Sequence, residues 1–119
     1  MPGLVKAAKA MSDEMRLRIL NLLLKRECCV CEVMQVLEIS QTRASRNLNI
    51  LHDAGFLKLR KEGLWSYYSL DKTGSGSYLR LLVEAVERGL ADNKAAKLDR
   101  KHLRDAHRPG SQCGSQAKQ

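Results

Sequence analysis

One six-residue segment, from Glu27 to Glu32, holds three of the four cysteines of the chain, Cys28, Cys29 and Cys31. Thiolates are soft, polarisable ligands that favour soft metals and metalloids over hard cations. Cysteines crowded in this way do not resemble the disulfide framework of a small secreted protein, so we expect reduced thiols. One cysteine alone would be interpreted as a small buried hydrophobe. Three thiols beside charged neighbours instead favour ligand binding or reversible oxidation.

The geometry of the three thiols depends on where the next helix begins. The sequence predicts a helix from near Cys29 or Val30 to Leu37, because apolar residues recur there at helical spacing. Residues i and i+3 of a helix share a face, whereas i and i+2 point well apart. Cys28 and Cys31 are therefore expected to be neighbours, and Cys29 and Cys31 are expected to converge only if the first turn unwinds.

The segments around the cysteines have helix signals in a fixed order. The Ser12 hydroxyl, followed by two carboxylates, opens a helix that runs to about Lys25. Ser40 caps a later helix, and Gly55 ends it, where a left-handed residue is expected. Two short helices joined by a tight turn are typical of a helix-turn-helix.

The pattern changes after this pair of helices. Apolar and polar residues alternate over 57–62, and 65–70 reads as a partner strand, with Gly63 between them. This pattern predicts a β-hairpin with a basic tip. The expected fold is therefore mainly α with a small β-hairpin, a winged helix-turn-helix.

The second helix of such a pair offers its N-terminal residues to base edges in the major groove of DNA. Gln and Asn can pair with adenine, Arg with guanine, and Ser and Thr are adaptable. The expected DNA-reading residues are Gln41, Thr42, Arg43, Ser45, Arg46 and Asn49. The wing residues expected along phosphates or in the minor groove are Lys58, Arg60, Lys61 and Gly63. A polar helix face alone is more often just solvated, but the cap, the basic hairpin and the positive charge together favour DNA.

Size and charge limit the classes of protein. The chain of 119 residues is long enough for one domain with a modest core. It carries 21 Lys and Arg against 13 Asp and Glu, a formal charge of +8, which favours polyanionic partners. The longest apolar run is Leu22 to Leu24, and no signal peptide pattern precedes it, so we expect a cytoplasmic protein without a membrane span.

The C-terminal part divides into two expected regions. A DNA-binding and dimerisation domain is expected over 1–91, followed over 92–119 by a basic helix extension and a disordered tail. One apolar stripe marks the last long helix of the first region, with Leu79, Leu82, Val83, Val86 and Leu90. This stripe exceeds what a small winged-helix core needs, so we expect it to form a homodimer. The alternative is that it packs only within its own subunit.

Five motifs carry a family resemblance, RLRIL at 16–20, CVCEV at 29–33, ISQ at 39–41 with SRNL at 45–48, LHDAGF at 51–56 and EGLWSYY at 62–68. Over roughly residues 4–90 the chain resembles the ArsR/SmtB family of metal-sensing repressors. The resemblance implies a homodimer that holds operator double-stranded DNA when empty and lets go when it binds an inducer. It implies no permanent cofactor and no catalytic residues.

The resemblance also implies the inducer. In arsenite-responsive members a Cys-Val-Cys motif is followed three residues later by a third cysteine. Cys29 and Cys31 match the first two positions, whereas Met34 occupies the third, and Cys28 is the expected substitute. Trivalent arsenic or antimony bound by all three thiols should distort the first helical turn, which opposes DNA binding. The basic residues 25–26 are expected to favour thiol deprotonation.

Alternative interpretations use the same cysteines. Cadmium or lead sensors share Cys-Val-Cys, and a redox or persulfide sensor would oxidise neighbouring thiols reversibly. Zinc or nickel sensors need histidines on the last long helix, and none lies between Ser77 and Ala91. A thiol reductase would need a Cys-x-x-Cys motif at a strand-to-helix turn, so an enzyme is not expected. Cys113 offers a further sulfur from the tail.

Overall fold

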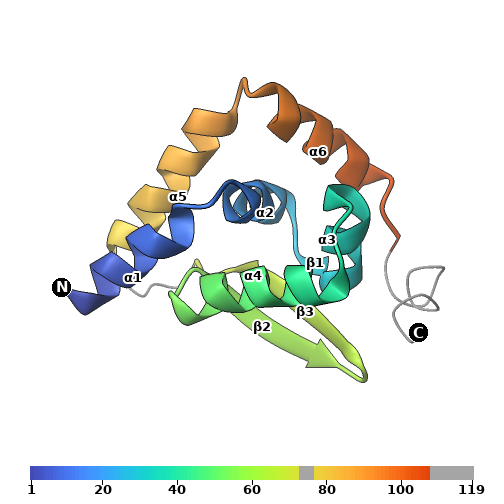
Figure 1. Ribbon diagram of the computed structural model, residues 1–119, viewed down its shortest axis with the longest axis horizontal. Coiled ribbons are helices and arrows are strands. Elements are labelled where there is room, and N and C mark those ends of the chain that lie inside the picture. Colours follow the sequence, from blue (N-terminus) through green and yellow to red (C-terminus); the bar gives the residue numbers. More distant parts are fainter. Residues whose placement is uncertain (73–76, 108–119) are drawn as a thin grey trace.

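The computed structural model describes residues 1–72 and 77–107 of the chain (Figure 1). In chain order the elements are α1 (Pro2–Met11), α2 (Glu14–Lys25), β1 (Cys28–Cys29), α3 (Val30–Leu37), α4 (Gln41–Asp53), β2 (Leu57–Glu62), β3 (Trp65–Leu70), α5 (Ser77–Leu90) and α6 (Lys94–Arg104). Helices α3 and α4 form the helix-turn-helix, and the β2–β3 hairpin is the wing. The predicted winged helix-turn-helix is confirmed. The expected disordered tail and Cys113 lie outside the described residues.

Side-chain caps fix the start of two helices around the core. The Ser40 hydroxyl accepts a hydrogen bond from the backbone N–H of Arg43 at 3.1 Å, so the predicted cap of α4 is confirmed. Helix α2 is capped by Asp13, whose carboxylate accepts from the N–H of Arg16 at 3.1 Å. The prediction that Ser12 caps α2 was wrong by one residue, because the Ser12 hydroxyl donates to a carbonyl of α1.

The wing forms as predicted. Strands β2 and β3 pair antiparallel from Leu57 opposite Leu70 to Glu62 opposite Trp65. The turn between them contains Gly63 at a φ of 61°, a left-handed conformation that glycine adopts without steric cost.

A third strand, β1, was not predicted. Cys28 pairs with Tyr68 and Cys29 pairs with Tyr67, so the sheet has the order β1-β3-β2. Helix α3 runs from Val30 to Leu37, as predicted, and the unpredicted strand of Cys28 and Cys29 directly precedes it. The tyrosine-bearing strand supplies hydrogen-bond partners that fix these two residues in an extended conformation, and the wing and the cysteine segment thus belong to one sheet.

Helix α2 lies in the centre of the molecule, with α5 and α6 above it, α1 and α3 to its left and right, and α4 and the sheet below it in the view of Figure 1. Its residues Ile19, Leu20 and Leu22 are fully buried in a single core that also contains Leu48 of α4 and Phe56. Burial of apolar side chains of this size is the dominant favourable contribution to folding.

The expected basic extension is a helix, α6, that is docked on the core. Both carboxylate oxygens of Asp99 accept hydrogen bonds from the Arg18 guanidinium, at 2.7 and 2.9 Å. Asn21 of α2 donates to the carbonyl of Ala96 at 3.1 Å, and Leu103 is buried in the same core cluster. Helix α6 therefore forms part of the folded unit.

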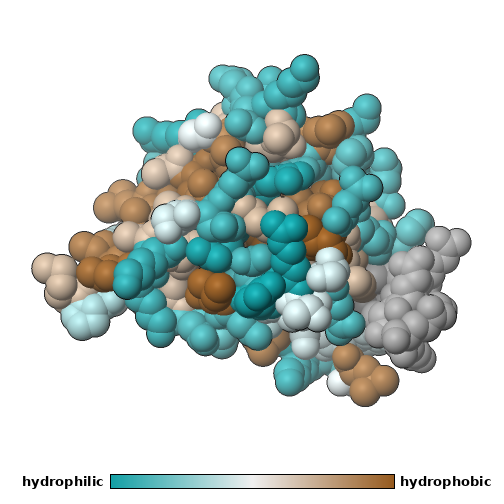
Figure 2. Space-filling model, in the orientation of Figure 1, coloured by the Kyte–Doolittle hydropathy of each residue, from teal (hydrophilic) through white to brown (hydrophobic). Residues whose placement is uncertain are grey.

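The apolar stripe of α5 packs mainly against its own chain. Leu79 and Val86 are 8% and 5% exposed, and the other three stripe residues, Leu82, Val83 and Leu90, are partly buried against the core. The large apolar side chains exposed on α1 and α5 are instead Leu4, Val5 and Leu81, together with Met1. Figure 2 shows hydrophobic side chains gathered over this end of the molecule. None of the described helices is both long and apolar enough to cross a membrane.

Candidate thiol site and nucleic-acid interface

The sulfur atoms of Cys29 and Cys31 lie 2.6 Å apart. Cys29 is the last residue of β1 and the N-cap of α3, with an extended backbone at φ −86° and ψ 164°, and Cys31 is the second residue of the helix. Because Cys29 stands outside the helix, the rule that i and i+2 point apart does not apply to this pair. The sulfurs of Cys29 and Cys31 therefore converge without the unwinding of the first turn of α3 that the sequence had led us to expect.

Cys28 faces the other way. Successive side chains of a strand point to opposite faces, and Cys28 is fully buried in the main core, whereas Cys29 and Cys31 form a separate cluster with Tyr67 and Trp65. The prediction that Cys28 and Cys31 are neighbours on one helix face was wrong, because Cys28 is not helical. The structure thus brings together the sulfurs of two of the three predicted ligands. Cys29 is a free thiol, whereas Cys31 is disulfide-bonded, so the expectation of reduced thiols was wrong for Cys31. Among residues 1–72 and 77–107, no group of three or more Cys, His, Asp or Glu side chains is arranged to hold a metal ion.

Burial raises the pKa of the Cys29 thiol to about 11. The removal of the thiolate from water is the largest cause, and the buried carboxylate of Glu32 adds to it. Backbone N–H groups of Glu32 and Cys31 point at the sulfur and offset part of the shift. The expectation that nearby basic residues favour deprotonation was wrong for this thiol, because Arg26 pairs with Glu32, at 2.8 Å between Nη1 and Oε2.

Glu32 is a site residue that the sequence interpretation missed. Its side chain is 0% exposed, and its Oε1 accepts a hydrogen bond from the backbone N–H of Cys29 at 3.0 Å. An acidic residue three positions after an N-cap is the signature of a capping box, and the sequence contains it. Arg26 also donates to the carbonyls of Glu27 and Leu103, at 3.0 and 3.1 Å. The thiol segment is thus connected to the end of α6.

The two sulfurs border a small pocket of about 140 Å³. Its walls come from the start of α3, the first turns of α4 and the tip of the wing, and are formed by Cys29, Val30, Cys31, Met34, Gln41, Ser45, Leu64, Trp65 and Ser66. Met34 holds the third position of the cysteine motif, so a thioether borders the same space. A group attached to the two sulfurs would therefore lie between the DNA-reading helix and the wing.

Helix α4 presents most of the predicted DNA-reading residues to solvent. Gln41, Thr42, Arg43 and Arg46 are exposed, and Ser45 is half-buried beside the thiol pocket. Asn49 is exposed but engaged, because its Oδ1 accepts a hydrogen bond from the Tyr68 hydroxyl at 3.0 Å. The opposite face of the helix is in the core, with Ala44, Leu48 and Leu51 fully buried.

The wing presents the four predicted residues, Lys58, Arg60, Lys61 and Gly63, all of them exposed. Arg60 differs from the lysines because its guanidinium is held by two carboxylates. Glu27 accepts from Nη2 at 2.8 Å and from Nε at 3.2 Å, and Glu62 accepts from Nη1 at 2.6 Å. These hydrogen bonds, with Glu27 the larger cause, raise the pKa of Arg60.

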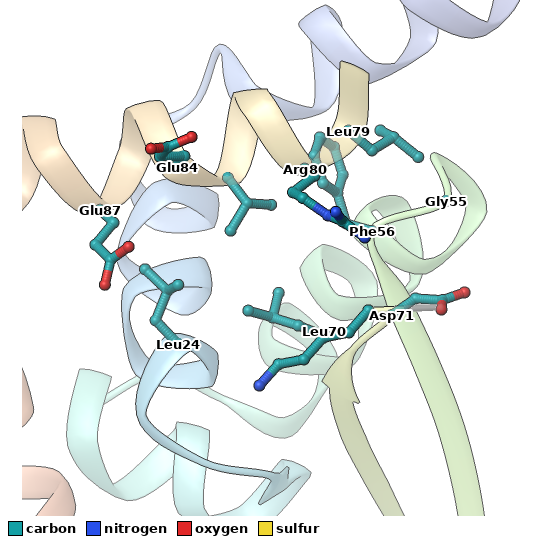
Figure 3. A pocket seen from close by; sticks show the side chains of 11 residues that line it. Leu24, Gly55, Phe56, Leu70, Asp71, Leu79, Arg80, Glu84 and Glu87 are labelled. Atoms are coloured by element: carbon teal, nitrogen blue, oxygen red, sulfur yellow. The ribbon is translucent and has the colours of Figure 1, made fainter. Parts of the chain in front are cut away.

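A larger pocket of about 490 Å³ lies between α2, α5 and the end of the wing sheet (Figure 3). Its apolar part is formed by Leu24, Phe56, Leu70, Leu79 and Val83, and charged side chains of both signs surround that part. No Cys or His side chain lines it. A soft metal or metalloid would find no ligand there, so the thiol pocket is the candidate site for such chemistry.

The fold and the exposed face of α4 define the chain as a winged-helix DNA-binding transcription regulator. Residues 13–58 match the sequence profile described as bacterial regulatory protein, arsR family. The arsenic resistance transcriptional regulator ArsR2 of Pseudomonas putida is 36% identical over 104 residues, which cover 82% of this chain and 90% of that protein. The chain belongs to the arsR family, as the motifs predicted.

Other relatives match over a shorter length. The cadmium resistance transcriptional regulatory protein CadC homolog of Staphylococcus aureus is 46% identical over 67 residues, 56% of this chain and 55% of that protein. The arsenical resistance operon repressor of Bacillus subtilis is 39% identical over 64 residues, 53% of this chain and 61% of that protein. The chain thus matches little more than half the length of these two relatives.

Solved structures share the fold. HlyU from Vibrio cholerae has a TM-score of 0.65 and 33% identity, covering 76% of this chain and 95% of that one. A homodimeric winged helix-turn-helix DNA-binding domain from Mycobacterium bovis has a TM-score of 0.63 and 27% identity, covering 78% of this chain and 82% of that one.

Proposed function

We propose that the chain is a cytoplasmic, homodimeric transcriptional repressor that releases operator double-stranded DNA when trivalent arsenic or antimony binds to its thiol pocket. One observation carries the proposal. The sulfurs of Cys29 and Cys31 lie 2.6 Å apart in a pocket that is also lined by Gln41 and Ser45 of α4. Relatives named for arsenic resistance support the choice of inducer.

Of the three predicted ligands, Cys29 and Cys31 have sulfurs close enough to share one ligand atom once the disulfide of Cys31 is reduced. Cys28 would first have to leave the core and give up its pairing with Tyr68. An atom bonded to both sulfurs sets their separation by its own bond lengths and so fixes β1 relative to α3. Helix α3 supports α4, so this change opposes the arrangement that fits the operator. An inducer shifts the equilibrium only by its difference in affinity for the two arrangements.

An operator-release titration with arsenite, antimonite, cadmium and zinc tests the proposal. Arsenite and antimonite should lower operator affinity of the wild-type chain, and Cys29→Ser or Cys31→Ser should abolish the response. Cys28→Ala is the matched control, since it removes a sulfur that faces the core, and Cys113→Ser controls for the tail. Normal release from the Cys29→Ser/Cys31→Ser double variant would end the proposal.

A second candidate function is the sensing of cadmium or of oxidants through the same two cysteines. The adjacency of two sulfurs favours oxidation as much as ligation, and one relative is named for cadmium resistance. Mass measured after mild oxidant, with and without arsenite, separates the two. Operator release by oxidant or cadmium but not by arsenite would replace the arsenic proposal with this one.

The homodimer is proposed to form through α1 and α5. The exposed residues Leu4, Val5 and Leu81 offer apolar surface, and the related Mycobacterium bovis domain is homodimeric. In a dimer the two α4 helices would meet half-sites about 34 to 36 Å apart, or a multiple of that distance. Light scattering at micromolar concentration should give twice the mass of the chain, and Leu81→Glu should give the monomer. A monomeric wild-type chain would contradict this assignment.

A further inference from the structure

The thiol pocket and the wing are joined by one row of residues across the sheet. Cys29 of β1 lies opposite Tyr67 of β3, and Tyr67 lies opposite Arg60 of β2. Directly opposed residues of an antiparallel pair project from the same face, with Cβ atoms about 4.5 to 5.5 Å apart. Cys29, Tyr67 and Arg60 therefore form a continuous row, with the tyrosine ring in the middle.

The contacts along this row are close. Tyr67 is 6% exposed and packs in the cluster that contains both Cys29 and Cys31. The guanidinium carbon of Arg60 lies over the same ring, 4.4 Å from its centroid, within the range of a cation–π interaction. A displacement of Cys29 must therefore be accommodated by the same ring on which Arg60 rests.

A second contact ties Arg60 to the cysteine segment. Glu27, which immediately precedes β1, accepts two hydrogen bonds from the guanidinium, and Glu62 at the wing tip accepts a third. Arg60 and its two carboxylate partners, Glu27 and Glu62, together carry a net charge of −1, which repels a phosphate. Arg60 is thus poorly suited to a phosphate contact in this arrangement, although it lies on a basic strand.

We propose that Arg60 is a positioning residue that passes the state of the thiol pocket to the wing through Tyr67 and Glu27, and is not a phosphate contact. When the thiols are empty, the row holds the wing in register with β1. A ligand atom shared by Cys29 and Cys31 shifts β1, which moves both the Tyr67 ring and the Glu27 carboxylate under the guanidinium. The wing then loses its alignment with α4. This inference rests on the proposed thiol-dependent release of DNA.

The experiment compares Arg60→Gln with Lys58→Gln, a matched change of a cation on the same strand. Operator affinity is measured against salt concentration by fluorescence anisotropy. Each phosphate neutralised contributes about 0.9 to the slope of log affinity against log salt, so losing two copies in a dimer lowers it by about 1.8. Lys58→Gln should show this loss and keep the wild-type release by arsenite. Arg60→Gln should keep the slope, and its ratio of operator affinities without and with arsenite should fall at least fivefold.

Binding at the thiols is followed separately through Trp65. It is the only tryptophan of the chain, and it borders the thiol pocket and packs against the cysteine cluster. Arg60→Gln should bind arsenite with the wild-type fluorescence titration while its DNA complex responds less. Glu27→Gln should reproduce this phenotype. The Glu27→Gln/Arg60→Gln double variant should weaken the release by arsenite little more than either single variant, since both changes remove the same contact between Glu27 and Arg60.

Two results would overturn the inference. One is a salt slope for Arg60→Gln that falls as for Lys58→Gln with an unchanged release ratio, because Arg60 would then be a phosphate contact. The other is full release by arsenite from the Glu27→Gln/Arg60→Gln double variant. Failure of the proposed function looks different, because arsenite would then leave both the Trp65 signal and the operator complex of the wild type unchanged. In that case the salt slope of Arg60→Gln still decides whether the residue contacts phosphate.

Discussion

The ion pair of Arg26 with the buried carboxylate of Glu32 predicts that removing one partner lowers the stability of the fold more than removing the other. Glu32 is 0% exposed and accepts a hydrogen bond from the N–H of Cys29, while the Arg26 side chain that neutralises it is 33% exposed. Removing the cation leaves a buried charge without its ion-pair partner, whereas removing the charge leaves a neutral amide of the same shape. The two halves of the pair should therefore differ in their effect on stability.

The magnitudes follow from the environment of each partner. Breaking a buried pair by removing one partner costs about 3 to 5 kcal/mol, which partial exposure of Arg26 reduces to about 2 to 3 kcal/mol for Arg26→Met. Glu32→Gln should cost only about 1 kcal/mol, because the amide oxygen still accepts from Cys29 and Arg26 keeps its two carbonyl acceptors. The Arg26→Met/Glu32→Gln double variant should be more stable than Arg26→Met alone by about 1 to 2 kcal/mol.

Urea unfolding followed by far-UV circular dichroism checks this order. With a slope of about 1 to 3 kcal/mol per M, a loss of about 2 to 3 kcal/mol in Arg26→Met should lower the midpoint by about 0.7 to 3 M. All variants are compared at one protein concentration, because the stability of a dimer depends on it. If Glu32→Gln lost as much stability as Arg26→Met, the cost would not come from an unpaired buried charge, and the reasoning would be refuted.

Four further predictions concern the Cys29 thiol, the docking of α6 and the contact between α2 and α4. With a pKa of about 11, Cys29 should be alkylated by iodoacetamide about tenfold faster per pH unit up to pH 10, and a rate that levels off above pH 9 would contradict the shift. Because this pKa is raised above its usual 9.0, the protonated thiol stabilises the fold below pH 9, and unfolding measured from pH 9 to 11 should show that contribution disappearing. Asp99→Asn leaves a neutral amide beside the partly exposed Arg18, so it should lower the free energy of unfolding by about 1 to 2 kcal/mol, and an unchanged free energy would mean that this pair does not hold α6 to the core. Asn47→Leu removes the acceptor of Arg16 and should cost about 1 to 2 kcal/mol in thermal unfolding, whereas an unchanged melting temperature would show that this contact is unimportant.

Elements with local signals could be predicted from the sequence. Helix α4 was placed correctly because the Ser40 cap and Gly55, at a φ of 97°, mark its two ends within the chain itself. The wing followed from alternation around Gly63. The family could be predicted for the same reason, since each of its motifs lies within a short segment of the sequence.

Features that depend on distant partners could not be predicted. A two-residue strand has no period to detect, and Cys28 and Cys29 are extended only because β3 pairs with them. Arg60 was correctly expected to be exposed and basic, but its carboxylate partner Glu27 lies 33 residues away in the sequence. The docking of α6 likewise depends on Asp99 reaching Arg18 across the fold. Composition identified these residues as polar without indicating their partners.

The two-residue strand β1 has a consequence for how the chain tolerates changes in length. A slip of one residue against a partner strand exchanges the side chains on the two faces. A slip of β1 by one residue would place Glu27 or Val30 opposite one of the two tyrosines, so only one cysteine would keep a tyrosine partner. A single insertion or deletion that shifts β1 is therefore expected to separate the sulfurs of Cys29 and Cys31, even where the helices around the core still pack.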